Sequence, residues 1–365
     1  MPSKNRASGK RGAVLIGALA PLSRPGWVEA GQQMLAGMQQ AVSDINAAGG
    51  LGGQELLLVV RDTAADPATA EAAVDALAGQ GVTAIAGEYH SVVARVIAAR
   101  AEALGIPFVC SSAVIDGLLE KPGRWVARIA PPQSKGWSRY AAHLLAAGHR
   151  HIAAACQPSV YWQAGIRILR ASHEAAGGSV AVLDLQSTEP AELCDRLAAG
   201  NATALLLLAG HPEPALSLAE AVLRDTRLSR LKLGAPAGQP EFPGWVERLG
   251  AGAAGIPFLR YLPPATAGKG VAIAARLSAR LGGTPSFVAL EGYDAMLVLA
   301  DALRQAGLDR ARVPLCWPKV QIEGSRGDIV LSRADEDTVW QWASAPVEIA
   351  ERDPADPERF RTVFR

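Results

Sequence analysis

The chain has 365 residues, of which 49% are hydrophobic and 19% are charged, and its formal net charge is +1. The length favours two domains, and the composition supplies enough apolar side chains for two cores. The balanced charge argues against a protein that binds nucleic acid or an anionic membrane surface directly. No apolar run approaches the roughly 18 residues needed to cross a bilayer, so we expect no membrane insertion.

The N-terminal residues resemble a secretion signal only superficially. The basic stretch MPSKNRASGKRG precedes the apolar run AVLIGALA, but a run of about eight residues is at the short limit for a signal core. Cleavage there would remove the first core strand, so we expect residues 1–12 to form a flexible tail. We expect a periplasmic protein if an upstream signal was removed, and a cytoplasmic one if the chain is complete.

The four cysteines are widely and irregularly spaced, with no CxxC pair and no Cys/His cluster. This pattern argues against structural zinc. Cys110 and Cys156 lie in apolar strand-like segments, where buried free thiols are common. We expect no metal and no cofactor.

Strand-like and Ala-rich helical segments alternate along the first third of the chain. Strands are predicted at 13–22, 54–62, 82–87 and 107–111. Helices are predicted at 27–48, at an Asp66–Pro67 start, and after Ser91 as N-cap. This alternation is typical of a doubly wound parallel sheet, in which ligands bind beyond the carboxyl ends of the strands. The loops PLSRPG, GEYHS and CSS are therefore candidate binding loops.

A second unit of the same kind follows the segment RIAPPQ, residues 128–133, which we interpret as a crossing between lobes. Its predicted helices and strands alternate at 135–147, 151–156, 162–176, 179–185, 190–199, 203–208, 213–224 and 231–234. Residues 255–264 are interpreted as a second crossing, before helices at 266–281 and 287–306. The end of the chain has strand-like pieces, KVQIEG, GDIVLS and APVEIAE.

These landmarks together resemble the type I periplasmic-binding-protein superfamily, in its leucine/isoleucine/valine-binding branch. The matching segments, in family order, are AVSDINAAGGLGGQELLLVVRDTAADP, GVTAIAGEYHS, GIPFVCSSA, RIAPPQSKG, PSVYWQAG and LEGYDAMLVLADAL. The resemblance implies an α/β fold with two Rossmann-like lobes joined by three crossover segments, with the ligand closed between them. We expect one lobe at 13–130 plus 262–318 and the other at 131–261 plus 319–365.

The resemblance also implies two possible roles. The first is the solute-binding component of an ABC importer of the branched-chain amino-acid type, which would dock on a permease. The second is a cytosolic amide or urea sensor that acts through a regulatory protein, because that branch shares the GEYHS loop pattern and the segment IEGSRGDIVLS. Both roles involve binding without catalysis.

Several site residues follow from matching the chain to the family. On the first lobe, Ser91 corresponds to the family serine that holds the ligand carboxylate or carbonyl, and Tyr89 to a ligand-contacting tyrosine of the amide-sensor branch. Ser111 and Ser112 end the fourth strand, where the family grips the ligand head. Val114 stands where amino-acid binders have Thr, so only its backbone N–H could contribute.

Three further residues are matched to aromatic contacts of the family. Tyr161 corresponds to the tyrosine that closes over the ligand, with Trp162 beside it where the family has Gly. His211 and Trp27 lie near aromatic contact positions of the second and first lobe. Each of these could instead be an ordinary surface or packing residue.

The main departure lies in the segment LGAPAGQPEF. Amino-acid binders carry an acidic residue there that pairs with the ligand ammonium, and this chain has Ala237. An unpaired ammonium in a closed cleft would cost several kcal/mol. Either Glu88 or Glu241 replaces the acid, or the ligand is a carboxylate or amide rather than a standard amino acid.

Other function classes lack their sequence signals. The chain has no GxGxxG after the first strand and no GxSxG, HExxH or P-loop. A repressor on the same ligand-binding fold would need a helix-turn-helix domain before the first strand, where only about a dozen residues stand. An enzyme and a direct DNA binder are therefore not expected.

Overall fold

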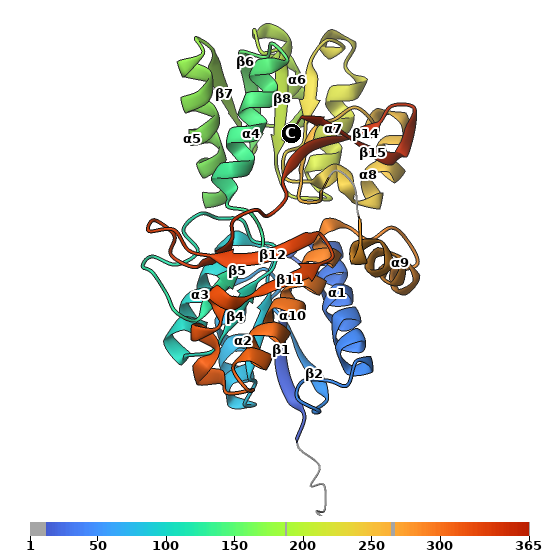
Figure 1. The fold of residues 1–365 in the computed structure, drawn as a ribbon. Helices are drawn as coiled ribbons and strands as arrows, with labels where there is room; N and C mark the ends of the chain where they lie inside the picture. The colour runs from blue at the N-terminus through green and yellow to red at the C-terminus, as the bar shows by residue number, and fades with distance from the viewer. Residues whose placement is uncertain (1–11, 187, 264–266, 365) are drawn as a thin grey trace, which may run out of the picture.

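The computed structural model describes residues 12–186, 188–263 and 267–364. The chain forms two α/β lobes, drawn one above the other in Figure 1. The described chain passes between them after β5 (Val126–Arg128), after β10 (Phe258–Arg260) and after β13 (Trp340–Trp342). We call the segments that follow these strands the first, second and third crossings. The predicted fold class, two α/β lobes with parallel sheets, is confirmed.

The first lobe is built on an eight-stranded sheet of order β11-β12-β13-β5-β4-β3-β1-β2. Its other strands are β1 (Val14–Ala20), β2 (Leu56–Asp62), β3 (Ala84–Gly87), β4 (Phe108–Cys110), β11 (Gln321–Gly324) and β12 (Gly327–Ser332). In this spatial order, each strand from β13 to β2 pairs in parallel with its neighbour. The pairs β11–β12 and β12–β13 are antiparallel. The buried strands are apolar because helices cover both faces of such a sheet.

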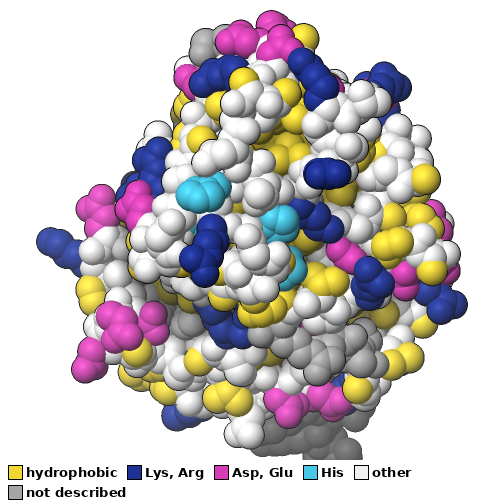
Figure 2. All heavy atoms as spheres, turned by 90° about the horizontal axis from the view of Figure 1, so that it is seen from above, with side chains coloured by type: hydrophobic (Ala, Val, Ile, Leu, Met, Phe, Trp, Pro, Cys, Tyr) yellow, Lys and Arg dark blue, Asp and Glu magenta, His cyan; other side chains and the backbone are white. Residues whose placement is uncertain are grey.

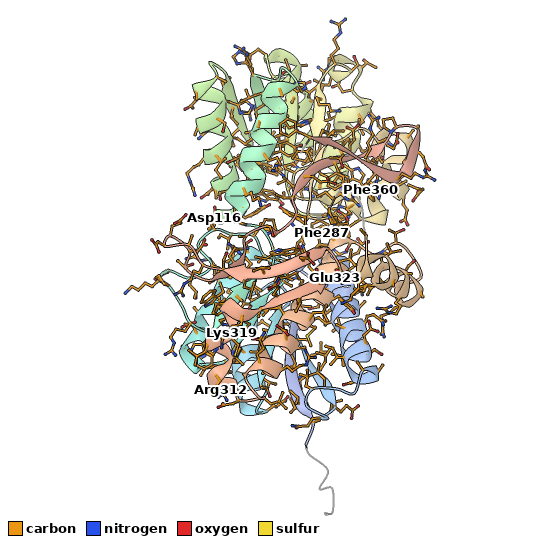
Figure 3. The ribbon with its side chains drawn as sticks, viewed as in Figure 1. Asp116, Phe287, Arg312, Lys319, Glu323 and Phe360 are labelled. Atoms are coloured by element: carbon orange, nitrogen blue, oxygen red, sulfur yellow. The ribbon has the colours of Figure 1, made fainter. Side chains whose placement is uncertain are left out.

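The second lobe has a four-stranded parallel sheet and a separate three-stranded antiparallel sheet. The parallel strands, in spatial order, are β7 (Ser179–Asp184), β6 (His151–Cys156), β8 (Ala204–Leu208) and β9 (Lys232–Gly234). The antiparallel sheet joins β10 to β14 (Glu348–Asp353) and β15 (Asp356–Phe364). Phe360, labelled in Figure 3, lies on this last strand, so the chain ends in the second lobe.

Ten α-helices of the described chain pack around these sheets. Those of the first lobe are α1 (Val28–Ala47), α2 (Pro67–Gly79), α3 (Ser91–Leu104), α9 (Lys269–Leu281) and α10 (Phe287–Gln305). Those of the second lobe are α4 (Gln133–Ala146), α5 (Val160–Ala175), α6 (Pro190–Ala199), α7 (Ala215–Arg224) and α8 (Pro243–Leu249). Most of the bounds agree with the predicted elements to within three residues.

The helix starts show how local residues set these bounds. Asp66 caps α2 as predicted, since its carboxylate accepts a hydrogen bond of 2.7 Å from the Thr69 N–H, and Pro67 takes the first helical position. The prediction of Ser91 as the N-cap of α3 is wrong by one residue, because the extended cap residue is His90. Ser91 is therefore the first helical residue, and its hydroxyl is not needed for capping.

The position of the late strands corrects one part of the predicted lobe division. Residues 319–365 were expected in the second lobe, but β13 pairs in parallel with β5 of the first-lobe sheet. β12 and β11 then extend that sheet by antiparallel pairing. Only β14 and β15, which follow the third crossing, pair within the second lobe. The local strand pattern could not reveal this, because strand pairing is a tertiary choice.

The face in Figure 2, seen from above the second lobe, mixes acidic, basic and apolar side chains. No helix within the described residues is both long enough and apolar enough to cross a bilayer. All four cysteines are free and buried. The predicted tail lies outside the described residues except for Gly12, and so does Thr266, the predicted start of the helix now seen as α9.

Candidate functional site: the cleft between the lobes

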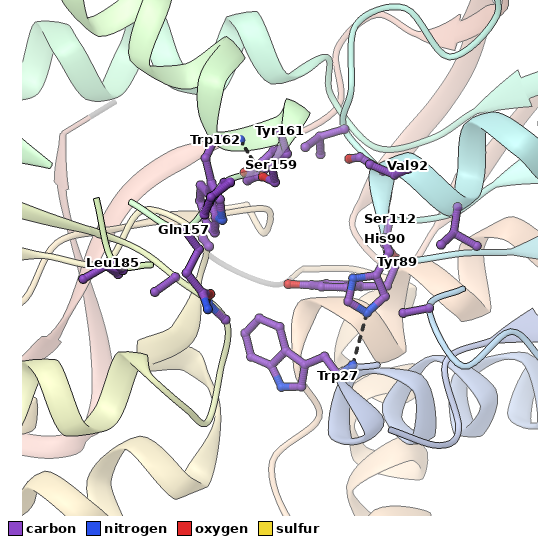
Figure 4. Close-up of a pocket in the computed structure, with 18 of the residues that line it drawn as sticks. Trp27, Tyr89, His90, Val92, Ser112, Gln157, Ser159, Tyr161, Trp162 and Leu185 are labelled. Atoms are coloured by element: carbon purple, nitrogen blue, oxygen red, sulfur yellow. Dashed lines mark hydrogen bonds between the residues drawn. The ribbon is translucent and has the colours of Figure 1, made fainter. Parts of the chain in front are cut away.

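A cavity of about 550 Å³ opens between the two lobes, within the usual range of small-molecule sites. Figure 4 shows first-lobe residues such as Trp27 and Tyr89 on one side and Gln157 and Trp162 of the second lobe on the other. The lining residues are Trp27, Ala65, Tyr89, His90, Ser91, Val92, Val93, Ser112, Val114, Gln157, Pro158, Ser159, Tyr161, Trp162, Leu185, Gln186, Ala209, Gly210, Ala237, Tyr261 and Phe287. None of them is Asp, Glu, Lys or Arg.

The first lobe forms one side of the cleft, which we call the first wall, and the second lobe forms the second wall. The N-terminus of α3 is the polar part of the first wall. Ser91, Val92 and Val93 occupy its first three positions, whose N–H groups have no acceptor within an α-helix. All three residues line the cleft. Together with the Ser91 hydroxyl, these donors and the helix dipole favour an anionic or carbonyl oxygen at this point.

Glu88 lies behind this wall rather than in it. Its side chain is fully buried, and Oε1 accepts hydrogen bonds from the N–H groups of Tyr89 (2.8 Å) and His90 (2.9 Å). Its Oε2 accepts a 2.7 Å bond from the Thr63 hydroxyl. Burial raises the pKa of Glu88 to about 7, against the opposing effect of these hydrogen bonds. Glu88 therefore holds the loop in shape, and the hypothesis that it pairs with a ligand ammonium is not supported.

His90 is a lining residue that the sequence analysis did not single out. Its Nε2 accepts a 3.1 Å hydrogen bond from the Trp27 N–H, drawn as a dashed line in Figure 4. Burial lowers the pKa of His90 to about 4, so the ring is neutral and carries its proton on Nδ1. His90 adds an uncharged donor to the first wall. His90 belongs to the predicted binding loop GEYHS, and this position could have identified it as a cleft residue.

The end of β4 brings two of its three predicted residues to the cleft. Ser112 and Val114 line it. Ser111 does not, because its wholly buried hydroxyl lies 3.5 Å from the sulfur of Met34 in α1. Its neighbour Ser112 lines the cleft, but the Ser112 hydroxyl donates a 3.3 Å hydrogen bond to Ser111 Oγ.

The second wall is aromatic and amide-rich. Tyr161 and Trp162 lie in the first turn of α5. Ser159 caps this helix, since its hydroxyl accepts a 3.1 Å bond from the Trp162 N–H. The Oε1 of Gln157 accepts a 2.7 Å bond from the Gly210 N–H, which leaves its NH₂ group as a donor beside the cleft. Gln157 directly follows β6, so the rule that ligands bind beyond strand ends could have found it.

His211 does not line the cleft but supports it. Its ring lies 4.9 Å from the Trp27 ring, which also contacts Phe242 at 4.5 Å between ring centres. Burial lowers the pKa of His211 to about 4. Trp27 of the first lobe thus packs against two side chains of the second, and the lobes touch along this side of the cleft.

The position without the family acid lies in the cleft, as Ala237 is a lining residue. Glu241 is not one. Its carboxyl is buried, with Oε1 accepting a 3.1 Å bond from the Phe287 N–H, and burial raises its pKa. Phe287 itself, labelled between the lobes in Figure 3, lines the cleft together with Tyr261. These two residues come from distant segments, and no local pattern identified them.

The cleft as a whole is an uncharged, donor-rich site with aromatic walls. The first lobe contributes hydroxyl, imidazole and helix N–H donors, and the second contributes amide and aromatic groups. Such walls can hold an oxygen-rich group at one end and a planar or apolar body against the rings. They contain no described carboxylate that could pair with an ammonium group.

Comparison with known proteins identifies the family of this chain. Residues 13–351 match the family described as "Periplasmic binding protein". A segment of 78 residues is 33% identical to the Leu/Ile/Val-binding protein homolog 2 of Brucella abortus (strain 2308), and it covers 21% of each chain. The chain thus matches about a fifth of the length of this curated relative.

Solved structures of low sequence identity share the whole fold. The leucine-binding protein LivK of Thermotoga maritima MSB8 is 20% identical, with a TM-score of 0.81 over 96% of this chain and 97% of that one. LivJ of Streptococcus pneumoniae, solved with isoleucine, is 18% identical, with a TM-score of 0.82 over 97% and 100%. A solute-binding protein of R. palustris, solved with benzoate, is 17% identical, with a TM-score of 0.80 over 96% of each chain. With a family match over residues 13–351, the chain belongs to the periplasmic binding protein family, and its fold is that of these solved structures.

Proposed function

We propose that this protein binds a small carboxylate without an α-ammonium group, by closing its lobes and without catalysis, as the solute-binding component of an ABC importer. The observation that carries the proposal is the charge of the cleft walls. They offer many neutral donors and no described carboxylate, with Ala237 at the position of the family acid. A ligand carboxylate would find partners there, whereas an ammonium would not.

The donors of the first wall suit the carboxylate end of such a ligand. The α3 N-terminus and Ser91 lie on one side of the cavity. Hydrogen bonds to a charged acceptor stabilise binding by about 1.5–3 kcal/mol each. The rings of Trp27, Tyr89 and Trp162 would enclose the body of the ligand, which favours an aromatic acid such as benzoate as the first probe.

The fold supports closure as the binding mechanism. Ligand contacts come from both lobes, so a bound ligand interacts with more groups when the lobes are closed than when they are open. A ligand shifts the population towards the conformation it binds better. The importer role would place the protein in the periplasm, where it would deliver the ligand to a permease.

Calorimetric titration, preceded by thermal-shift screening, tests the proposal with benzoate, benzamide, leucine and acetamide as probes. Benzoate at 100 times its dissociation constant should stabilise the fold by about 2.7 kcal/mol. Benzamide, with the same ring and no charge, is the matched control and should bind more weakly. Binding of leucine in preference to benzoate would contradict the ligand class, and binding of acetamide or benzamide alone would favour the amide-sensor role instead.

A further inference from the structure

Arg326 occupies the two-residue turn between β11 and β12. Its side chain is completely buried. The guanidinium donates to Asp294 Oδ2 at 3.0 Å through Nε and to Glu291 Oε1 at 2.9 Å through Nη1. Both carboxylates stand on α10, one helical turn apart, so this arginine is anchored to the first lobe.

The remaining contacts of Arg326 lead to all three crossings. Its Nη1 donates to the carbonyl of Tyr261 and its Nη2 to that of Ile129, each at 3.3 Å. Ile129 begins the first crossing and Tyr261 begins the second. The guanidinium carbon also lies 5.0 Å from the centre of the ring of Trp342, the last residue before the third crossing. A single side chain thus contacts the first residue of two crossings and the strand residue that directly precedes the third.

The turn that carries Arg326 is held tightly against α10. Asp294 Oδ1 accepts a 2.6 Å bond from the Ser325 N–H, and the Ser325 hydroxyl donates to the Leu290 carbonyl. A Cβ atom on Gly324 would lie only 2.8 Å from Asp294 Oδ1. The close approach of hairpin and helix leaves the guanidinium little freedom. We call Arg326, Glu291, Asp294 and Trp342 the hinge cluster.

General stability does not explain this arrangement well. A buried ion cluster loses the hydration of its charges, and apolar residues of similar volume often stabilise a fold equally or better. The bidentate, planar geometry of a guanidinium does provide directional contacts that an apolar side chain cannot. We therefore attribute to the hinge cluster a geometric role, which is to fix the arrangement of the three crossings, rather than a contribution to stability.

We propose that Arg326 is a positioning residue that sets the angle between the lobes by holding the starts of the three crossings in one fixed arrangement. It does not line the ligand cleft. The inference rests on the proposed function only in that lobe closure binds the ligand. Its consequence, a defined lobe arrangement, exists in the ligand-free protein and can be measured there.

The test measures the distance between the lobes by pulsed electron paramagnetic resonance in the ligand-free protein. Spin labels on Ala76→Cys in α2 and Ala198→Cys in α6 report on the two lobes, since both positions are exposed and all four native cysteines are buried. Arg326→Lys keeps the charge but loses the planar fork of donors, and Arg326→Met loses both. We expect a broadened or shifted distance distribution for Lys and a larger change for Met.

Arg333→Met is the matched control. This arginine follows β12, donates to the Gly123 carbonyl and stacks on Trp340 at 5.1 Å, but all of these groups belong to the first lobe. It should leave the distance distribution unchanged. A folded Arg326→Lys protein with the wild-type distribution would overturn the proposal. If the Met variant does not fold, Arg326→Lys and Trp342→Leu decide the matter, because a merely structural role would lower the melting temperature without changing the distance.

Ligand titration separates this proposal from the proposed function. If benzoate binds, the Arg326 variants should raise its Kd by the factor by which the closed population falls. If benzoate does not bind, the ligand class is wrong, while the distances in the ligand-free protein still test the hinge.

Discussion

The ligand cleft and the hinge cluster lie close together between the same lobes but use opposite chemistry. No described residue lining the cleft is Asp, Glu, Lys or Arg. In the hinge cluster, Arg326, Glu291 and Asp294 are wholly buried. Charge is thus kept out of the walls that would face the ligand and is concentrated where the chain crosses between lobes.

The two regions should therefore respond differently to substitution. A new charge in the cleft should act directly on the ligand, because an uncharged wall has no counter-ion for it. A lost charge in the hinge cluster should act on its neighbours, because the remaining buried charges lose their partner. Ligand affinity and lobe geometry can therefore be altered separately, and four predictions use this separation.

The largest effect is expected from placing a carboxylate in the cleft. Ala237→Glu should lower benzoate affinity by several kcal/mol, which corresponds to more than about 100-fold, because like charges would face each other. Ala237→Gln, similar in size and neutral, is the control and should cost much less. Calorimetric titration of both variants decides, and equal losses would mean that no ligand charge lies near residue 237.

The second effect is a pH dependence that arises in the hinge cluster. Burial raises the pKa of Glu291 to about 8, despite the opposing charge of Arg326. The folded state then binds more protons than the unfolded state from about pH 4.5 to about pH 8, so this group contributes stability below pH 4.5 that is lost as the pH rises towards 8.

Glu291→Gln should remove that loss, and urea unfolding across the pH range would measure it. The glutamine amide keeps an oxygen that can accept a hydrogen bond from Arg326. Glu336→Gln, at an exposed loop position, is the control. A wild-type slope in Glu291→Gln would show that the carboxyl is ionised throughout.

A smaller effect distinguishes two serines at helix starts on opposite walls. Ser91→Ala should weaken benzoate binding by about 1.5 kcal/mol or more, since it removes a donor to a charged group, and should hardly change stability because His90 is the cap. Ser159→Ala should instead lower the unfolding free energy by about 1 kcal/mol, because Ser159 is a true N-cap. A loss of stability in Ser91→Ala with unchanged affinity would reverse these two assignments.

The smallest effect concerns two buried histidines beside the cleft. Burial lowers the pKa of both His90 and His211 to about 4. The folded state therefore binds fewer protons than the unfolded state between about pH 4 and 6.5, and stability falls as the pH drops through this range. His90→Gln and His211→Gln should each reduce the fall seen in thermal unfolding at low pH. His151→Gln, at the start of β6 and outside the cleft, should not.

Much of the site lies at strand ends and helix starts, and the resemblance to the family picked out individual residues there. Trp27, Tyr89, Ser91, Ser112, Val114 and Tyr161 were matched to the family in this way, and all line the cleft; their contact with a ligand stays a prediction. The other three candidates do not line the cleft, because their side chains pack elsewhere. Ser111 points into the core, Glu88 is occupied by its own loop, and His211 lies behind Trp27.

The order of the elements, the α/β class and the resemblance to the family could all be read from the amino-acid sequence. The first two follow from hydrophobic period and from Gly, Pro and Asp at element ends, which act over a few residues, and the third follows from matching ordered segments to the family. The three-dimensional packing of distant segments placed β11–β13 in the first lobe and brought Arg326 to the carbonyl of Ile129, 197 residues away along the chain. Strand pairing and buried ion pairs depend on which distant surfaces meet, and no local pattern encodes that choice.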